Sequence, residues 1–256
     1  MVKPKKNLGQ HFLTDKNIAR KISESISKKG TIVEVGPGTG MLTQFFINEP
    51  DINFFAIETD NEAYNYLIKE YPEKADKIIF ADFLKYDLTK IAGKEKFSVI
   101  GNYPYNISSQ IFFKILDYRN QITEAAGMIQ KEVADRIAAS PGNKTYGILS
   151  VLLQAYFDIE YLFTVHENVF NPPPKVKSAV VSLKRNSVEK LACNEKLFFS
   201  IVKQSFGQRR KMLRASLKSL CKNIDTNQYD IFTKRPEQLS VNEFVELTNI
   251  LAKEAG

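Results

Sequence analysis

Over the first 150 residues, short runs of β-branched and aromatic residues alternate with stretches of helical periodicity. Five runs predict strands, at residues 31–35, 53–57, 77–80, 97–100 and 125–129. Helical patterns precede or separate them, at residues 15–29, 62–71 and 109–118. Strands that alternate with helices predict an α/β fold, in which helices cover both faces of a mainly parallel sheet.

The pattern changes after about residue 150. Two strand-like runs follow closely, at residues 157–165 and 178–183, and we expect them to form an antiparallel edge of the same sheet. Beyond Asn186 only helical patterns remain. One helix is predicted from Glu195 to Cys221, with an apolar stripe made of Phe199, Val202, Phe206, Leu213, Leu217 and Leu220. We therefore predict two domains, residues 1–187 and a small all-helical domain at 188–256.

The composition is that of a globular protein. The chain has 256 residues, of which 43% are hydrophobic, enough for a sizeable core. Neither a membrane-spanning run nor a signal-peptide core is evident, so we expect a cytoplasmic protein, and a monomer. The two cysteines and two histidines have no metal-type spacing. We therefore expect no metal site and no membrane partner.

Positive charge is concentrated near the two ends of the chain. The net charge is +7, and residues 196–224 contain eight lysines or arginines and no acid. In the predicted helix, Arg210, Arg214, Lys218 and Lys222 follow one another at intervals of four, opposite the apolar stripe. A face with one sign of charge favours a polyanionic partner such as RNA over a merely solvated surface.

A glycine-rich turn follows the first predicted strand. The glycines of Gly36-Pro37-Gly38-Thr39-Gly40 leave room for a ligand against the backbone. Met41 stands where a dinucleotide-binding fingerprint has its third glycine, which argues against a nicotinamide oxidoreductase. The turn is suited to an adenosyl group.

Two acids follow the next predicted strands. Glu58 ends the second strand, at the distance where a carboxylate can accept hydrogen bonds from ribose hydroxyls. Asp82 follows the third strand and could accept from the amine of an adenine, whose ring Phe83 could cover. Either acid alone could instead be a helix cap. The combination of glycines and two acids at strand ends favours a ligand site.

The fourth strand ends in Asn102-Tyr103-Pro104-Tyr105. Together with the glycines and acids, this motif resembles the class I S-adenosylmethionine-dependent methyltransferases that modify the amino group of adenine. The Asn102 side-chain oxygen and the Pro104 carbonyl could accept from the two amine hydrogens, and Tyr105 could stack on the base.

Further motifs are similar to the KsgA-type ribosomal RNA adenine dimethyltransferases over nearly the whole chain. They are residues 7–13 (NLGQHFL), 36–40 (GPGTG), 102–108 (NYPYNIS), 130–133 (QKEV), 170–176 (FNPPPKV) and 208–211 (QRRK). One departure is Tyr103, where the family usually has an aliphatic residue.

The resemblance implies dimethylation of adenines in 16S ribosomal RNA of an assembling 30S subunit, with S-adenosylmethionine as cofactor. It implies a Rossmann-like methyltransferase sheet and a base pocket closed by Phe170. The implied cofactor contacts are His11, Leu13, Gly36, Glu58, Asp82 and Asn102. The residues expected to bind RNA are Arg209, Arg210, Lys211, Arg214 and Lys218.

Two alternatives share these features. The first is an adenine methylase of large-subunit ribosomal RNA that confers antibiotic resistance, and it shares the Asn-x-Pro-Tyr chemistry. The second is an RNA-binding assembly factor that has kept the fold without catalysis. The Pro172-Pro173-Pro174-Lys175-Val176 segment and residues 208–210 favour the small-subunit enzyme over the first, and the intact Glu58, Asp82 and Asn102 argue against the second.

Overall fold

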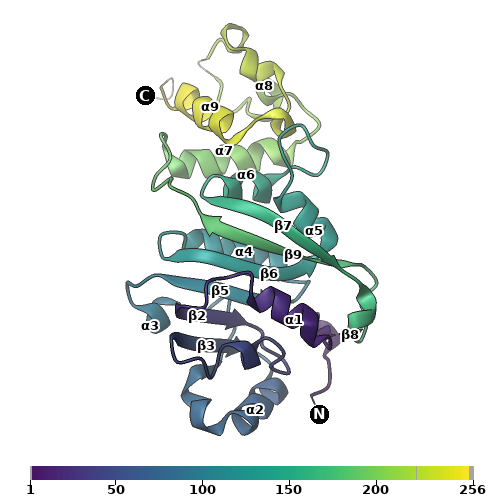
Figure 1. The fold of residues 1–256 in the computed structure, drawn as a ribbon. Helices are drawn as coiled ribbons and strands as arrows, with labels where there is room; N and C mark the ends of the chain where they lie inside the picture. Colours follow the sequence, from purple (N-terminus) through teal and green to yellow (C-terminus); the bar gives the residue numbers. More distant parts are fainter. Residues whose placement is uncertain (1, 223, 254–256) are drawn as a thin grey trace. The chain divides into compact units, whose positions relative to one another are not determined.

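A computed structural model describes residues 2–222 and 224–253, which form two compact units (Figure 1). The first unit contains residues 2–134 and 158–185, and the second contains residues 135–157 and the described part of 186–253. Within these described residues, no helix is both long and apolar enough to cross a membrane.

Seven strands form the main sheet, in the order β4-β3-β2-β5-β6-β9-β7 (Figure 1). Their bounds are Gly30–Val35 (β2), Ile52–Glu58 (β3), Ile78–Phe80 (β4), Phe97–Asn102 (β5), Ile122–Gln130 (β6), Phe157–Val165 (β7) and Ser178–Arg185 (β9). The strands from β4 to β6 are parallel, and β9 is antiparallel to β6. The predicted strands are confirmed, including the late pair at one edge.

Four α-helices belong to the first unit: α1 (Lys16–Ser23), α2 (Asn61–Glu70), α3 (Thr89–Ala92) and α4 (Ser108–Asp117). The unit also has 3₁₀ turns at Lys6–Leu8, Thr43–Phe45, Pro72–Lys77 and Glu167–Val169. Asp15 caps α1 by accepting from the backbone N–H groups of Asn17 and Ile18. This helix ends at Ser23, earlier than expected, and there the hydroxyls of Ser23 and Ser25 donate to the carbonyls of Arg20 and Ile22.

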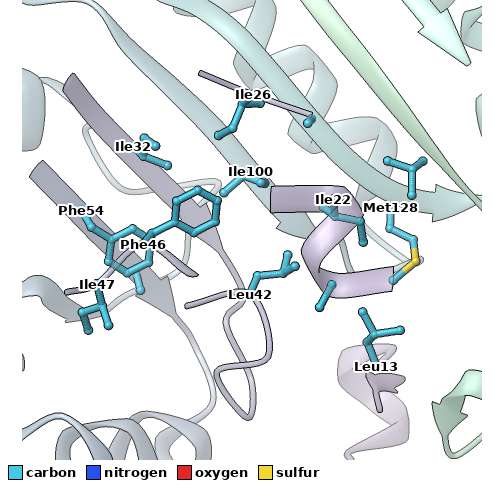
Figure 2. Close-up of a cluster of buried hydrophobic side chains, with 14 of the residues drawn as sticks. Leu13, Ile22, Ile26, Ile32, Leu42, Phe46, Ile47, Phe54, Ile100 and Met128 are labelled. Atoms are coloured by element: carbon cyan, nitrogen blue, oxygen red, sulfur yellow. The ribbon is translucent and has the colours of Figure 1, made fainter. Parts of the chain in front are cut away.

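The two faces of the sheet carry different side chains. Residues paired across parallel strands point to the same face, so Glu34, Ile100 and Ala126 share one side. On this side a buried apolar cluster gathers side chains from α1, the strands and residues 41–47 (Figure 2). Figure 2 labels Ile22 of α1 and Ile100 of β5 among them. The apolar cluster therefore packs on the face of the sheet that carries Glu34, just before the glycine-rich turn in the chain.

One acid is buried in this layer. The Glu34 side chain is only 1% exposed and accepts a hydrogen bond from the Thr43 hydroxyl at 2.7 Å. Burial raises the pKa of Glu34 to about 8, and the bond from Thr43 opposes the rise. Glu34 is therefore largely protonated at neutral pH.

The second unit is helical. Its elements include most of α5 (Lys131–Ile137), α6 (Ile148–Gln154), α7 (Glu195–Gly207), α8 (Leu213–Ser216) and α9 (Val241–Lys253), with 3₁₀ turns at Thr226–Gln228, Asp230–Thr233 and Pro236–Gln238. Aromatic contacts hold these elements together. The ring of Tyr146 lies 6.2 Å from that of Phe206, which lies 6.0 Å from that of Phe244 in α9.

The prediction of one continuous helix from Glu195 to Cys221 is wrong. The helix ends at Gly207, and α8 begins only after Met212, which has extended backbone angles. The Leu213 N–H donates to the Lys234 carbonyl at 2.8 Å instead of continuing a helix. Residues 208–211 are polar, so no apolar side chain packs against the core to stabilise a helix over them. The bond from Leu213 to Lys234 therefore forms in place of a helical hydrogen bond.

The second unit also differs from the proposed domain at 188–256. It begins at Asn186 on the C-terminal side but includes the earlier residues 135–157. Tyr156 explains part of this grouping, because its hydroxyl donates to Glu195 of α7 at 2.8 Å. Such contacts between distant segments leave no local signal in the sequence.

A pH titration of stability tests the assignment of Glu34. The raised pKa of Glu34 favours the folded state fully below about pH 4.5, and this contribution is lost as the pH rises to about 8. The loss is at most about 1.4 kcal/mol per pH unit. Glu34→Gln keeps an acceptor for Thr43 but cannot ionise. We expect its melting temperature to match wild type near pH 5 and to exceed it by several degrees at pH 8.

The measurement is thermal unfolding at intervals of pH 0.5. If the variant and the wild type lose stability in parallel between pH 5 and pH 8, Glu34 does not titrate in this range.

Candidate active site

A pocket opens at the edge of the sheet where the parallel strands end. Its wall includes Val35, Gly36 and Gly38 at the end of β2, and residues 57–59 at the end of β3. Residues 102–107, at and after the end of β5, also line it. The loop after β4 adds residues 81–84, and the N-terminal segment adds residues 8–12. Five separate parts of the first unit therefore meet at one pocket.

The glycine-rich turn forms one wall. Gly36, Gly38 and Gly40 all have positive φ, between 57° and 79°, which favours glycine. A Cβ at Gly38 would lie 2.9 Å from the ring of Phe12, so that position also needs the missing side chain for space. The turn thus presents bare backbone to the pocket, as an adenosyl ligand requires.

Glu58 lies beside this turn at the end of β3. Its carboxylate accepts from the Gly38 N–H at 2.9 Å and from the Asp60 N–H at 2.8 Å. Burial raises the pKa of Glu58, and the backbone hydrogen bonds, including those from Asp60 and Gly38, oppose the rise. A carboxylate fixed in this way at the pocket wall can accept from the hydroxyls of a ribose.

Asp82 and Phe83 line the pocket from the loop after β4. One Asp82 oxygen accepts from the Leu84 N–H at 2.9 Å, and the other lies 3.6 Å from the Lys85 ammonium. Asp82 therefore does cap its own loop, yet it also lines the pocket. Phe83 is buried, with the Lys114 ammonium 5.1 Å from its ring centroid.

Asn102 is oriented by one hydrogen bond. Its Nδ2 donates to the His11 carbonyl at 2.9 Å. Because a carbonyl can only accept, this bond requires the amide nitrogen on that side and leaves Oδ1 as an acceptor. Asn102 and His11 both line the pocket. The arrangement thus provides an acceptor of known direction.

Pro104 and Tyr105 lie next to Asn102 and also line the pocket. The Pro104 carbonyl accepts from the Ile107 N–H at 3.2 Å, which leaves its second lone pair for a ligand. The Tyr105 hydroxyl shares a short hydrogen bond with Ser178, and its ring centroid lies 5.2 Å from that of His11. Burial raises the pKa of Tyr105, which keeps its hydroxyl neutral.

Tyr103 also lines the pocket, and its ring is buried against Gly101 and Gly127 of the sheet. It is 1% exposed, and its hydroxyl donates to the Ala126 carbonyl at 3.3 Å. A Cβ on Gly127 would lie 2.3 Å from its ring. The tyrosine is accommodated because Gly127 has no side chain, so the departure at Tyr103 changes how the pocket wall packs against the sheet.

Two predicted site residues are not in this pocket. Leu13 and Phe170 pair across a separate two-stranded sheet, β1 (Phe12–Leu13) with β8 (Phe170–Asn171), and both belong to the apolar cluster. Leu13 lines a smaller cavity on the far side of the glycine turn. Phe170 is packed in that cluster and is not among the residues that line the pocket.

An ionic cluster that the sequence did not reveal holds the N-terminal segment against the site. Asp60, which caps α2, forms an ion pair with Lys5 and accepts from Gln10 at 3.0 Å. The hydrogen bonds from Lys5 and Gln10 lower the pKa of Asp60 against the effect of its burial. The only available signal was an Asp at a helix start, which does not identify its distant partners.

The predicted RNA-binding residues lie in the second unit. Arg210 and Lys211 are exposed in the turn after α7, whereas Arg214 and Lys218 are exposed within and after α8. Arg209 is engaged within the unit, because it donates to the Asn143 carbonyl at 3.4 Å and lies 3.9 Å from Glu237. The basic residues are thus clustered along the chain but do not lie on one helical face.

Comparison with solved structures identifies the class of fold. A dimethyladenosine transferase from Plasmodium falciparum superposes with a TM-score of 0.80 at 24% identity, over 96% of this chain and 98% of that one. The 23S rRNA methyltransferase ErmE superposes with a TM-score of 0.67 at 24% identity, over 93% and 99%. The fold is that of the class I S-adenosylmethionine-dependent methyltransferases.

The sequence comparisons identify the family. The model of the ribosomal RNA adenine dimethylase family matches residues 1–253. The Ribosomal RNA small subunit methyltransferase A of Parabacteroides distasonis is 56% identical over 100% of this chain and 98% of its own length. The protein of that name from Flavobacterium johnsoniae is 55% identical over 96% and 95%. The chain therefore belongs to the ribosomal RNA adenine dimethylase family, whose cofactor is S-adenosylmethionine.

The role of Glu58 can be tested by cofactor binding. Glu58→Gln removes the charge but keeps one oxygen to accept a backbone N–H. We expect the variant to bind S-adenosylmethionine more weakly by about 1.5–3 kcal/mol, the range for hydrogen bonds to a charged group. Isothermal titration calorimetry measures the change, and Glu70→Gln, an exposed site in α2, is the matched control. Equal affinity in a folded Glu58→Gln variant would exclude this carboxylate from the cofactor site.

Proposed function

We propose that this protein dimethylates the exocyclic amines of adenines in 16S ribosomal RNA during assembly of the 30S subunit. The observation that carries the proposal is the Asn102 amide, which is oriented by the His11 carbonyl and leaves Oδ1 free to accept at the wall of the cofactor pocket. The names of the small-subunit methyltransferases that share 55–56% identity with the chain support the choice of RNA.

The chemistry explains why an asparagine is used. The lone pair of the adenine amine is delocalised into the ring, so the nitrogen must become pyramidal before it can attack a methyl group. Acceptors for its two hydrogens, Asn102 Oδ1 and the Pro104 carbonyl, favour that geometry. S-adenosylmethionine, when bound, would supply an electrophilic methyl group, and its sulfur would leave as a neutral thioether when the S–C bond breaks. The amine becomes acidic as the new N–C bond forms, so water can take the proton.

The aromatic residues of the pocket are suited to a base taken out of its stack. Tyr105 is held through its hydroxyl by Ser178, which fixes the ring beside Asn102. We propose that this ring stacks on the target adenine. Phe170 could close the other face only after β8 moves, because it is packed in the core.

Three further features of the proposal concern partners and location. No metal is needed, since a sulfonium methyl group is already electrophilic and Asn102 and Pro104 supply the polar contacts. We expect a monomer that acts in the cytoplasm, where small subunits are assembled. RNA contacts are assigned to Arg210, Lys211, Arg214 and Lys218, with Arg209 supporting the turn that carries the first two.

The direct test is transfer of labelled methyl groups from S-adenosylmethionine to immature 30S particles, followed by mapping of the modified nucleotides. We expect wild type to dimethylate adenines, and Asn102→Ala to lose about 100-fold or more in rate, because a transition-state acceptor is lost. Cofactor affinity is measured separately, since Asn102 also lines the cofactor pocket. Asn48→Ala, an exposed site, is the control. Labelling of isolated large-subunit RNA instead would favour the large-subunit alternative, and near-normal turnover by Asn102→Ala would refute the mechanism.

The RNA surface is tested by replacing Arg210, Arg214 and Lys218 with Gln. Each lost phosphate contact should flatten the dependence of log affinity on log salt by roughly 0.7–0.9. Cofactor affinity and thermal stability should stay near wild type, because all three side chains are exposed. The control variant replaces the exposed Lys29, Lys69 and Lys94 with Gln, which changes the net charge equally. An identical salt slope in the two variants would show that the cluster around α8 is only solvated.

A further inference from the structure

The loop between β8 and β9, residues 172–177, is anchored at both ends beside the proposed base pocket. At one end, the Pro172 carbonyl lies 2.8 Å from Nδ1 of His11. At the other, the Lys177 carbonyl accepts from the Lys131 N–H at 2.9 Å, and the next residue, Ser178, is bonded to the Tyr105 hydroxyl. Because His11 and Tyr105 both line the pocket, the loop begins and ends beside it.

The exposed part of this loop carries an apolar side chain between two cations. Pro174 is buried, whereas Lys175, Val176 and Lys177 are exposed. Val176 is 47% exposed and is one of three large hydrophobic side chains that are exposed among the described residues; the others are Phe80 and Met212. Three consecutive prolines restrict the backbone before it, so the position of Val176 is held with little freedom.

A single exposed valine is usually of no consequence. Three features distinguish Val176: a restrained backbone, a lysine on each side, and a loop end bonded to the tyrosine proposed to stack on the target base. The first limits the entropy lost when the loop binds a partner. The two lysines can pair with phosphates on both sides of an apolar contact made by Val176. Together they describe a surface for nucleic acid next to an extruded base.

We propose that Val176 packs against the base next to the target adenine, on the face that is uncovered when the adenine enters the pocket. Lys175 and Lys177 then contact the adjoining phosphates. Apolar side chains are known to enter base steps in this way and to replace lost stacking contacts. Extruding a base costs stacking energy, and Val176 offsets part of this cost. This inference rests on the proposed RNA methylation.

The test uses Val176→Thr, which keeps the shape and the β-branch but makes the tip polar. Under single-turnover conditions with saturating enzyme and 30S particles, we expect its methylation rate constant to fall about tenfold. Val176→Leu should retain the wild-type rate, because it stays apolar. Affinity for S-adenosylmethionine should be unchanged in both. Phe80→Ala, at an exposed apolar position in β4, is the matched control and should also keep the wild-type rate.

A second measurement separates a stacking role from a general loss of RNA binding. Particles are prepared with an abasic nucleotide at the 5′ or the 3′ neighbour of the mapped target, each tested separately. When the abasic nucleotide is the neighbour that Val176 would cover, there is no base for Val176 to contact. Val176→Thr and wild type should then react at equal rates.

The outcomes distinguish this inference from the proposed function. If wild type methylates adenine but Val176→Thr retains its rate, the proposed contact between Val176 and the neighbouring base is wrong and the proposed function stands. A Val176→Thr defect that persists with both abasic particles also contradicts it. If wild type labels no adenine, the proposed function fails, and this inference fails with it.

Discussion

The hydrogen bond from Asn102 to the His11 carbonyl is the constraint on which the geometry of the site depends. It joins the end of β5 to the N-terminal segment, two parts of the chain that are 91 residues apart. His11 in turn contacts the Pro172 carbonyl, so the loop after β8 is tied to the same point. This amide thus sets the direction of an acceptor, and its bond adds to the Asp60 contacts and the β1–β8 pairing that hold the N-terminal segment at the site.

Burial determines how the acids of the site behave. Glu34 and Glu58 are both nearly inaccessible, and burial raises the pKa of each. Their partners differ. Glu34 accepts from the Thr43 hydroxyl, whereas Glu58 accepts from the backbone N–H groups of Gly38 and Asp60. Backbone donors stabilise a carboxylate, which fits Glu58 to a ligand with hydroxyl donors. Glu34 fits better as a neutral acid that packs against Thr43.

The elements that the sequence predicted are those set by local patterns. The strand runs and the glycine turn follow from residue type and spacing, and because parallel strands end at one edge, Glu58, Asp82 and Asn102 were expected together. The errors arose where distant contacts prevail. Leu213 bonds to Lys234 and interrupts the predicted helix. Phe170, which the resemblance assigns to the base pocket, pairs through β8 with β1 and lies in the apolar cluster, a placement that no local pattern indicates.

The site combines residues at the ends of the parallel strands with residues from segments outside them. The glycine turn, Glu58 and Asp82 lie on the strand ends and can hold an adenosyl group whatever the methyl acceptor is. The side that would meet RNA is built instead from segments outside the parallel strands, namely residues 8–12 and the loop 172–177. The His11 ring of the first segment lies 5.2 Å from that of Tyr105. The second segment is tied to His11 through the Pro172 carbonyl and ends next to Ser178, the partner of the Tyr105 hydroxyl. The loop 172–177 lies outside the strands that carry Glu58 and Asn102, so it can vary without a change in those strands.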